Sequence, residues 1–168
     1  MIDLSVQLSG VHIGFSTPKT WNPLSWLIRK MLKSNISHMW LVYWDLDFQA
    51  YYVMQAARNG FILQSFENFK KDNIICDIIT PKIDISEGFR KISKELSSNY
   101  DIKGLFGMFL VELSKRFIRR IKNPFKSEHN MFCTEVISRA MFYSNYPGIT
   151  KENIESLSPI DIRNILQN

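Results

Sequence analysis

The sequence predicts one α+β domain in which a small antiparallel sheet packs against a helix. Its 168 residues are enough to bury a core without disulfides or metals. Short runs of aromatic and β-branched residues separated by turn signals fill the first half, and helical periodicity follows in the second half. With 45% hydrophobic residues, the composition excludes a disordered or collagen-like chain.

A strand and a helix are predicted before residue 35. Residues 6–15 alternate between apolar and polar, and Ser16-Thr17-Pro18 is expected to end the strand. Asn22 fits an N-cap with Pro23 at the first helical position, and apolar residues then recur at spacings of three and four. These signals predict a helix from Pro23 to about Lys33.

Residues 39–44 and 48–57 are rich in aromatic residues and predict a β-hairpin. If Leu46-Asp47 is a two-residue loop, His38 and Gln55 are directly opposed on neighbouring strands. Further strands are expected at 61–66, after the Asn59-Gly60 turn, and at 73–80, where Cys76 is expected to be a buried packing residue. Helices are expected at 86–96, 100–122, 133–143 and from Ser158 onward.

Cys133 and His38 carry the reactive chemistry that the sequence suggests. Cys133 begins a predicted helix, where the positive end of the helix dipole favours a thiolate. His38 opens a predicted strand, and an imidazole placed against the thiol could remove its proton. A packed cysteine on an apolar helix face, with an unrelated strand histidine, explains the same positions.

Other sites have weaker support. His129 lies four residues before Cys133, in a polar stretch that is expected to be a loop, and His12 has only strand neighbours. The histidines and cysteines lack the spacing of a zinc site, and no glycine-rich phosphate loop is present, so we expect no metal or cofactor.

Several short motifs occur together in a recognisable order. They are Ser37-His38 before an apolar strand, Gln55-Ala56 before Asn59-Gly60-Phe61, Tyr100-Asp101, Phe132-Cys133-Thr134-Glu135-Val136 and Ser158-Pro159-Ile160-Asp161-Ile162. In this order the chain resembles the circularly permuted branch of the NlpC-type papain-like superfamily, especially its YiiX-like members, and more distantly lecithin retinol acyltransferase. The resemblance implies one permuted papain-like domain over residues 1–168, with a helical insertion between the sheet and the cysteine.

The resemblance also implies roles for individual residues. Cys133 would be the nucleophile, His38 the general base and Gln55 the residue that orients the imidazole, in a position that is often acidic in YiiX-like relatives. Tyr100 would donate to an oxyanion or anchor the helix. The expected activity is a thiol hydrolase or acyltransferase that cleaves an amide or ester of a peptide, a peptidoglycan peptide or a lipid-like substrate. The alternative is a catalytically silent papain-like domain that serves as a binding module.

Net charge is concentrated in one stretch of the chain. No acidic residue lies between Leu113 and Ser127. The same stretch contains the cations Lys115, Arg116, Arg119, Arg120, Lys122 and Lys126. The apolar run 105–111 before them is too short to span a bilayer, so a peripheral contact with an anionic membrane, a core helix with a solvated basic face and, as the weakest alternative, nucleic acid remain open. No export signal is visible, and we expect a cytoplasmic protein with reduced thiols.

Overall fold

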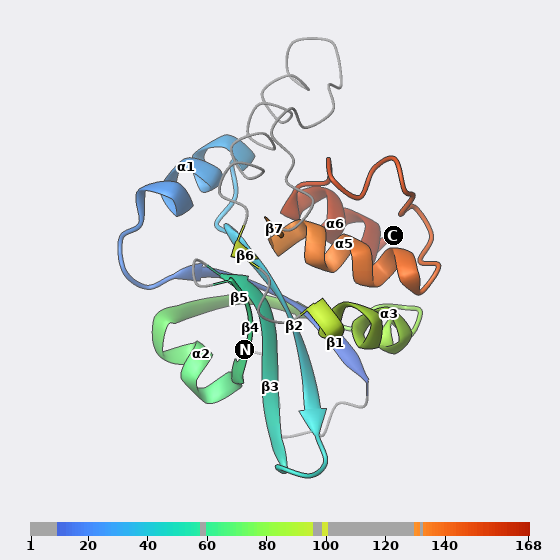
Figure 1. Cartoon of the computed structure of the whole chain (residues 1–168). Helices are drawn as coiled ribbons and strands as arrows, with labels where there is room; N and C mark the ends of the chain where they lie inside the picture. Colours follow the sequence, from blue (N-terminus) through green and yellow to red (C-terminus); the bar gives the residue numbers. More distant parts are fainter. Residues whose placement is uncertain (1–9, 58–59, 96–98, 101–129, 132) are drawn as a thin grey trace.

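The computed structural model describes residues 10–57, 60–95, 99–100, 130–131 and 133–168 (Figure 1). It confirms the α+β class: a five-stranded antiparallel sheet of order β4-β3-β2-β1-β5 is combined with helices. The strands of this sheet are β1 (Val11–Pro18), β2 (His38–Asp45), β3 (Ala50–Ala57), β4 (Gly60–Ser65) and β5 (Asn73–Ile79). The helices are α1 (Pro23–Leu32), α2 (Phe66–Asp72), α3 (Ser86–Ile92), α5 (Cys133–Tyr143) and α6 (Pro159–Gln167), and a short 3₁₀ turn covers Ser93–Glu95.

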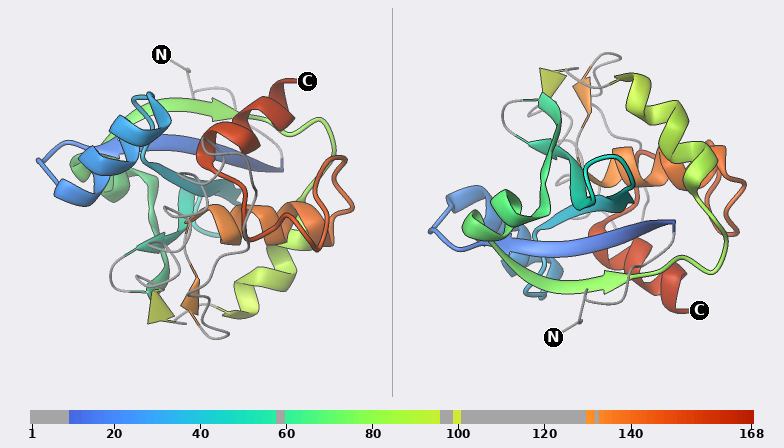
Figure 2. Two further views of the ribbon diagram at one scale, coloured as in Figure 1. Left: turned by 90° about the horizontal axis from the view of Figure 1, so that it is seen from above. Right: turned by 90° about the horizontal axis from the view of Figure 1, so that it is seen from below.

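Both faces of the sheet are covered. On one face, α3, α5 and α6 pack over a large core cluster that includes Phe15, Leu41 and Ile137. On the other face, α2 closes a smaller cluster around Trp40, which touches the rings of Phe66 and Phe69. Figure 2 shows α1 projecting from one side of the molecule, whereas α3, α5 and α6 gather on the other side. The helix that begins with Cys133 is therefore supported by the main core.

Strand β1 runs further than the sequence predicts. It continues through Ser16 and Thr17 to Pro18, which pairs with Asn73 of β5. The two hydroxyl residues are buried, because Ser16 accepts the Trp40 indole N–H and Thr17 bonds to hydroxyls of neighbouring elements. Side-chain hydrogen bonds thus keep these polar residues inside the strand, although the sequence predicted that they would end it. Residues 6–9 of the predicted strand lie outside the described part.

The predicted β2–β3 hairpin forms, but its predicted register is wrong. Asp45 pairs with Ala50, so the loop contains the four residues 46–49 rather than two. The Asp45 carboxylate accepts the backbone N–H groups of Asp47 and Phe48, and Gln49 adopts a left-handed conformation with φ of 50°. This side-chain capped turn is a stable alternative to the tight loop, for which the sequence had only a weak signal.

Strand β5 matches its prediction, but the expected burial of Cys76 is wrong. Cys76 is exposed, and so is Ile74, because β5 is an edge strand whose outward face is only partly covered. The Cys76 thiol points to the carbonyl of Asn35, which follows α1. The two cysteines of the chain form no disulfide.

The last two helices agree with the sequence analysis. Helix α5 has the predicted bounds, and α6 begins with a capping box formed by Ser158 and Asp161. The helix predicted from residue 100 does not begin there, because Tyr100 lies in the short strand β6 (Asn99–Tyr100), which pairs with β7 (Asn130–Met131). The helical insertion and its basic stretch, residues 101–129, lie outside the described residues. In the parts that the structure does describe, every helix is too short or too polar to cross a bilayer.

Helix α1 has the predicted N-cap, which gives a first testable result. The Asn22 carboxamide oxygen accepts the backbone N–H of Ser25 at 3.0 Å, while the Asn22 side chain itself is exposed. We expect Asn22→Ala to lower the free energy of unfolding by about 1 kcal/mol, since one helix N–H loses its partner. Asn22→Asp keeps an acceptor at the cap and should remain near wild type in urea unfolding. Equal losses in both variants would show that the cap bond contributes nothing.

Candidate active site

Cys133 is the first residue of α5 and lies almost entirely inside the protein. Its side chain is 4% exposed and belongs to the large core cluster together with Val136, Ile137 and Ala140 on the same helix face. This spacing of three and four residues turns the face of α5 toward the sheet, as the sequence predicts. The helix start therefore presents the thiol to the strands and not to bulk solvent.

His38 and Gln55 are in contact in the structure. His38 Nε2 and Gln55 Oε1 are 2.7 Å apart; Gln55 is buried, and His38 as a whole residue is partly buried. An amide oxygen only accepts hydrogen bonds, so Nε2 carries the proton and donates it. In the neutral ring, Nδ1 is then the nitrogen with an available lone pair. The predicted direct opposition of these two residues is wrong, but the predicted contact between their side chains is present.

The contact between His38 and Gln55 is diagonal and lies where β2 and β3 stop pairing. Strands β2 and β3 pair only from Leu41 and Met54 toward the hairpin loop. Beyond that point His38 pairs with Ser16 of β1, and Gln55 pairs with Ile62 of β4. Long side chains reach diagonal neighbours across a sheet, which lets Gln55 hold the ring from the next strand.

The thiol lies beside the first residues of β2. The backbone N–H groups of Met39, Thr134 and Cys133 itself act on the sulfur, and Met39 is the neighbour of His38 in the chain. Among the described residues, no hydrogen bond joins the sulfur to the imidazole; the ring bonds to Gln55 and lies near Phe69 of α2. The structure therefore brings all three residues to one end of β2, where the described residues show a hydrogen bond between His38 and Gln55. The His38 ring lies toward Phe69 of α2, whereas Cys133 belongs to the core cluster on the other face of the sheet.

The electrostatics differ from the helix-dipole expectation. Burial raises the pKa of the Cys133 thiol, and the three backbone N–H groups offset this rise only in part. Burial also lowers the pKa of the His38 imidazole, while its bond to Gln55 acts in the opposite direction. Both shifts favour the neutral forms, so the resting site holds a thiol and a neutral imidazole rather than an ion pair. Desolvation outweighs the dipole here because the sulfur lies within the core.

A cluster of buried hydroxyls behind His38 was not found from the sequence. Ser25 of α1 lies 2.7 Å from the Ser37 hydroxyl, and Thr17 of β1 is bonded to both. The cluster ties α1 and β1 to the residue before His38, so it fixes the backbone at the start of β2. The only sequence signal is the Ser37-His38 pair, because hydroxyls far apart in the chain show no periodic pattern.

The remaining candidates contribute little to this site. Tyr100 pairs through its backbone with Met131, but its side chain, His129 and the cations from Lys115 to Lys126 lie outside the described part. His12 is buried on β1 and bonds Thr80 at 2.9 Å, away from the start of β2. No cluster of three or more potential metal ligands occurs within the described ranges.

No family model matches this chain, and no curated protein is significantly similar to it. The function of this chain is therefore inferred from the arrangement of its own residues.

Proposed function

We propose that this protein is a thiol hydrolase or acyltransferase that cleaves an amide or ester through a thioacyl-enzyme. The observation that supports this best is the 2.7 Å bond between His38 and Gln55 at the end of β2, where α5 begins with Cys133 and its thiol meets the N–H of Met39. A cysteine at a helix start, a histidine at the adjoining end of a strand and a polar residue that orients the histidine are the groups that nucleophilic acyl transfer uses.

In the proposed reaction, His38 acts as a general base when the substrate is attacked. Its Nδ1 takes the proton of the Cys133 thiol while the sulfur bonds to the carbonyl carbon, and the imidazolium then protonates the leaving amine or alcohol. Water, or an acceptor hydroxyl or amine, next attacks the thioester and releases the thiol. Both groups start neutral, so proton transfer accompanies attack. The sulfur and Nδ1 have to approach each other in the substrate complex, as catalytic hydrogen bonds often tighten only there.

Backbone N–H groups at the helix start are available for the oxyanion. The first N–H groups of a helix have no acceptor within the helix. Those of Cys133 and Thr134 act on the sulfur in the resting protein, and the same region would receive the negative carbonyl oxygen of the tetrahedral intermediate. This assignment supplies a second donor, which the sequence alone did not identify.

The pH dependence of the reaction tests the role of Gln55. Activity requires a neutral His38, and the lowered pKa of this imidazole keeps it neutral below its ordinary value of 6.5. The acid limb of kcat/KM for p-nitrophenyl acetate should therefore lie below pH 6.5. In Gln55→Glu, a carboxylate at Nε2 favours the imidazolium, so the limb should move to higher pH.

The matched control is Gln167→Glu, which makes the same charge change at an exposed position of α6. Its profile should overlay that of the wild type. An acid limb that is identical in Gln55→Glu and wild type would exclude Gln55 and His38 from the proposed mechanism.

A binding module without catalysis is the second candidate. It is favoured by the same pKa directions, since a buried neutral thiol without a hydrogen bond to the imidazole is also what a packed structural cysteine provides. The two proposals differ in one respect: only the hydrolase forms a covalent acyl adduct at Cys133. Substrates of the peptide, peptidoglycan-peptide and lipid-like acyl classes are all compatible with this chemistry.

A further inference from the structure

Helix α1 and the residues just before it carry apolar side chains that are exposed in the described part of the structure. Trp21, Leu24 and Trp26 are 77%, 41% and 47% exposed. No α1 residue belongs to either core cluster, and Ser25 is the only residue of the helix that is fully buried. Exposed aromatic residues gathered on one element mark an interaction surface more often than chance exposure does. We refer to residues 21–35 as the α1 surface.

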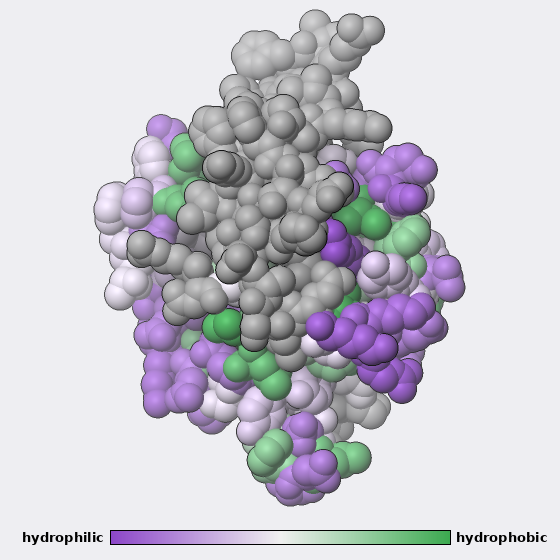
Figure 3. Space-filling model, in the orientation of Figure 1, coloured by the Kyte–Doolittle hydropathy of each residue, from purple (hydrophilic) through white to green (hydrophobic). Residues whose placement is uncertain are grey.

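The α1 surface is also basic. Between Trp21 and Asn35 the chain contains Arg29, Lys30 and Lys33 and no acidic residue. The Lys30 ammonium lies 4.9 Å from the Trp26 ring centroid, so cations and aromatic rings occupy the same surface. At the upper left of Figure 3, over α1, hydrophobic and hydrophilic patches lie side by side. This combination is typical of helices that lie in the interface of an anionic membrane.

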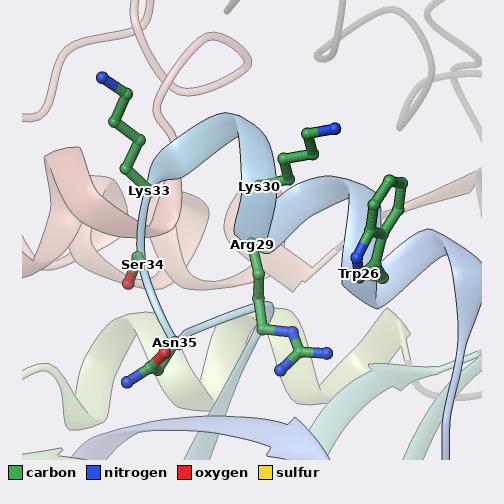
Figure 4. A pocket seen from close by; sticks show the side chains of 6 residues that line it. All are labelled: Trp26, Arg29, Lys30, Lys33, Ser34 and Asn35. Atoms are coloured by element: carbon green, nitrogen blue, oxygen red, sulfur yellow. The ribbon is translucent and has the colours of Figure 1, made fainter.

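A hollow at the C-terminal half of α1 has the chemistry of a headgroup site. Its volume is about 410 Å³, and it is lined by Trp26, Arg29, Lys30, Lys33, Ser34 and Asn35. Figure 4 shows Lys30 and Lys33 extending from α1 in the direction opposite to Arg29. The Arg29 Nε is buried and has no hydrogen-bond acceptor among the described residues. Two lysine ammonium groups beside a hydroxyl and an amide suit a phosphate group.

We propose that the α1 surface docks this protein on a bilayer that contains anionic phospholipid. Trp21, Leu24 and Trp26 enter the interfacial region, and Lys30 and Lys33 contact headgroup phosphates. Tryptophan is enriched at this depth of a membrane, and each cation near an anionic bilayer adds to the attraction. The proposal is independent of the basic stretch at 115–126.

A second exposed apolar site does not share this chemistry. Leu46 and Phe48, at the β2–β3 loop, are 71% and 70% exposed, but Asp45 and Asp47 flank them. Carboxylates are repelled by an anionic surface. The charge of α1, and not exposure alone, therefore selects it as the docking surface.

The α1 surface is coupled to the candidate active site. The buried bond between Ser25 and Ser37 joins α1 to the residue before His38. Docking would thus hold the start of β2 close to the bilayer, where an acyl substrate of lipid type would be found. Membrane binding itself does not require thiol chemistry, so Cys133→Ser should bind vesicles as the wild type does.

Vesicle co-sedimentation with the full chain tests the proposal. Vesicles of phosphatidylcholine with phosphatidylglycerol should bind the protein more strongly than vesicles of phosphatidylcholine alone, and added salt should weaken binding. Lys30→Glu with Lys33→Glu should lower the partition coefficient at least about tenfold. Trp21→Ser with Trp26→Ser should also lower it, because two interfacial anchors are lost.

Two control variants carry the same kinds of substitution at positions away from α1. Lys82→Glu with Lys94→Glu reverses two exposed charges away from α1, and Leu46→Ser with Phe48→Ser removes two exposed apolar groups. Both should bind like the wild type. Circular dichroism spectra that match the wild type establish that each variant is folded.

Several results would overturn the proposal. Equal binding to neutral and anionic vesicles, absence of binding at low salt, or wild-type binding by the Lys30/Lys33 variant would each do so. Loss of binding in Arg119→Glu with Arg120→Glu but not in the α1 variants would assign the membrane contact to the basic stretch instead. A dimer in sedimentation velocity that Trp21→Ser with Trp26→Ser dissociates would show that a second copy covers α1.

Discussion

Replacement of Cys133 by serine should lower the rate of p-nitrophenyl acetate hydrolysis by about a thousandfold or more. The proposed reaction has a single nucleophile, and removing one member of a nucleophile–base pair typically removes most of the catalysis. His38→Ala should cause a comparable loss, because the buried thiol has a raised pKa and depends on the imidazole to accept its proton. The double variant should be little worse than either single variant, since the two residues act as a unit.

Cys76 provides the matched control for this prediction. It is the other cysteine of the chain, and it is exposed whereas Cys133 is buried. Cys76→Ser should retain the full rate. Loss of activity in Cys76→Ser with retention in Cys133→Ser would place the reactive thiol on the edge strand β5 and would contradict the proposed site.

Gly88→Ala should destabilise the protein by about 3 kcal/mol, against the usual effect of this substitution. Alanine in place of glycine within a helix normally stabilises by about 1 kcal/mol. Here a Cβ at Gly88 would collide with the carbonyl oxygen of Ala140, and that atom belongs to the backbone of α5. Helices α3 and α5 would have to separate, which would also strip the Gly88 N–H from the Ser144 hydroxyl.

Urea unfolding measures this effect, and Arg90→Ala is its control. Arg90 lies on the same helix and is exposed, so its truncation should change the free energy of unfolding by no more than about 0.5 kcal/mol. A Gly88→Ala protein as stable as the wild type would mean that α3 and α5 are not packed as closely as described. Because α5 carries Cys133, Gly88→Ala should also lower the rate of p-nitrophenyl acetate hydrolysis at urea concentrations at which the variant is still folded.

The elements that the sequence predicted well have strong local signals. Helix α1 was predicted from Asn22 and Pro23, α6 from its capping box, and α5 from its apolar period. Such caps act within a few residues of the chain, so tertiary context rarely overrides them. The strands were also found, but the end of β1 was not, because it depends on side-chain hydrogen bonds to other elements. The ends of the hairpin strands were missed because the Asp45 carboxylate caps a longer loop than the one predicted.

The candidate site was predicted in part. His38 and Gln55 were placed together by a two-residue loop that does not exist, and they meet because long side chains cross the diagonal between β2 and β3. The burial of Cys133 was visible in its helix face, but its consequence for the thiol pKa was not. Desolvation of the thiol depends on all the groups packed around the sulfur, and the helical pattern of the sequence does not specify that packing.

Helix α1 is a second case in which a local sequence pattern does not reveal the packing. Its apolar period predicted an apolar face, yet Leu24 of that face is exposed and the others are only partly buried: Leu27, Ile28, Met31 and Leu32. A period of three and four residues gives the width of an apolar stripe but does not say what covers it. The partly exposed apolar face of α1 is therefore the observation that suggests contact with a membrane.

Mass spectrometry of the acylated protein tests the central claim most directly. The wild type and Cys76→Ser would be mixed with p-nitrophenyl acetate, quenched in acid, digested and mapped. We predict an acetyl group on the peptide that contains Cys133 in both proteins, and a strongly reduced amount in His38→Ala. Acetylation at Cys133 that is unchanged in His38→Ala, or an adduct confined to Cys76, would contradict the assignment of Cys133 and His38 as nucleophile and base.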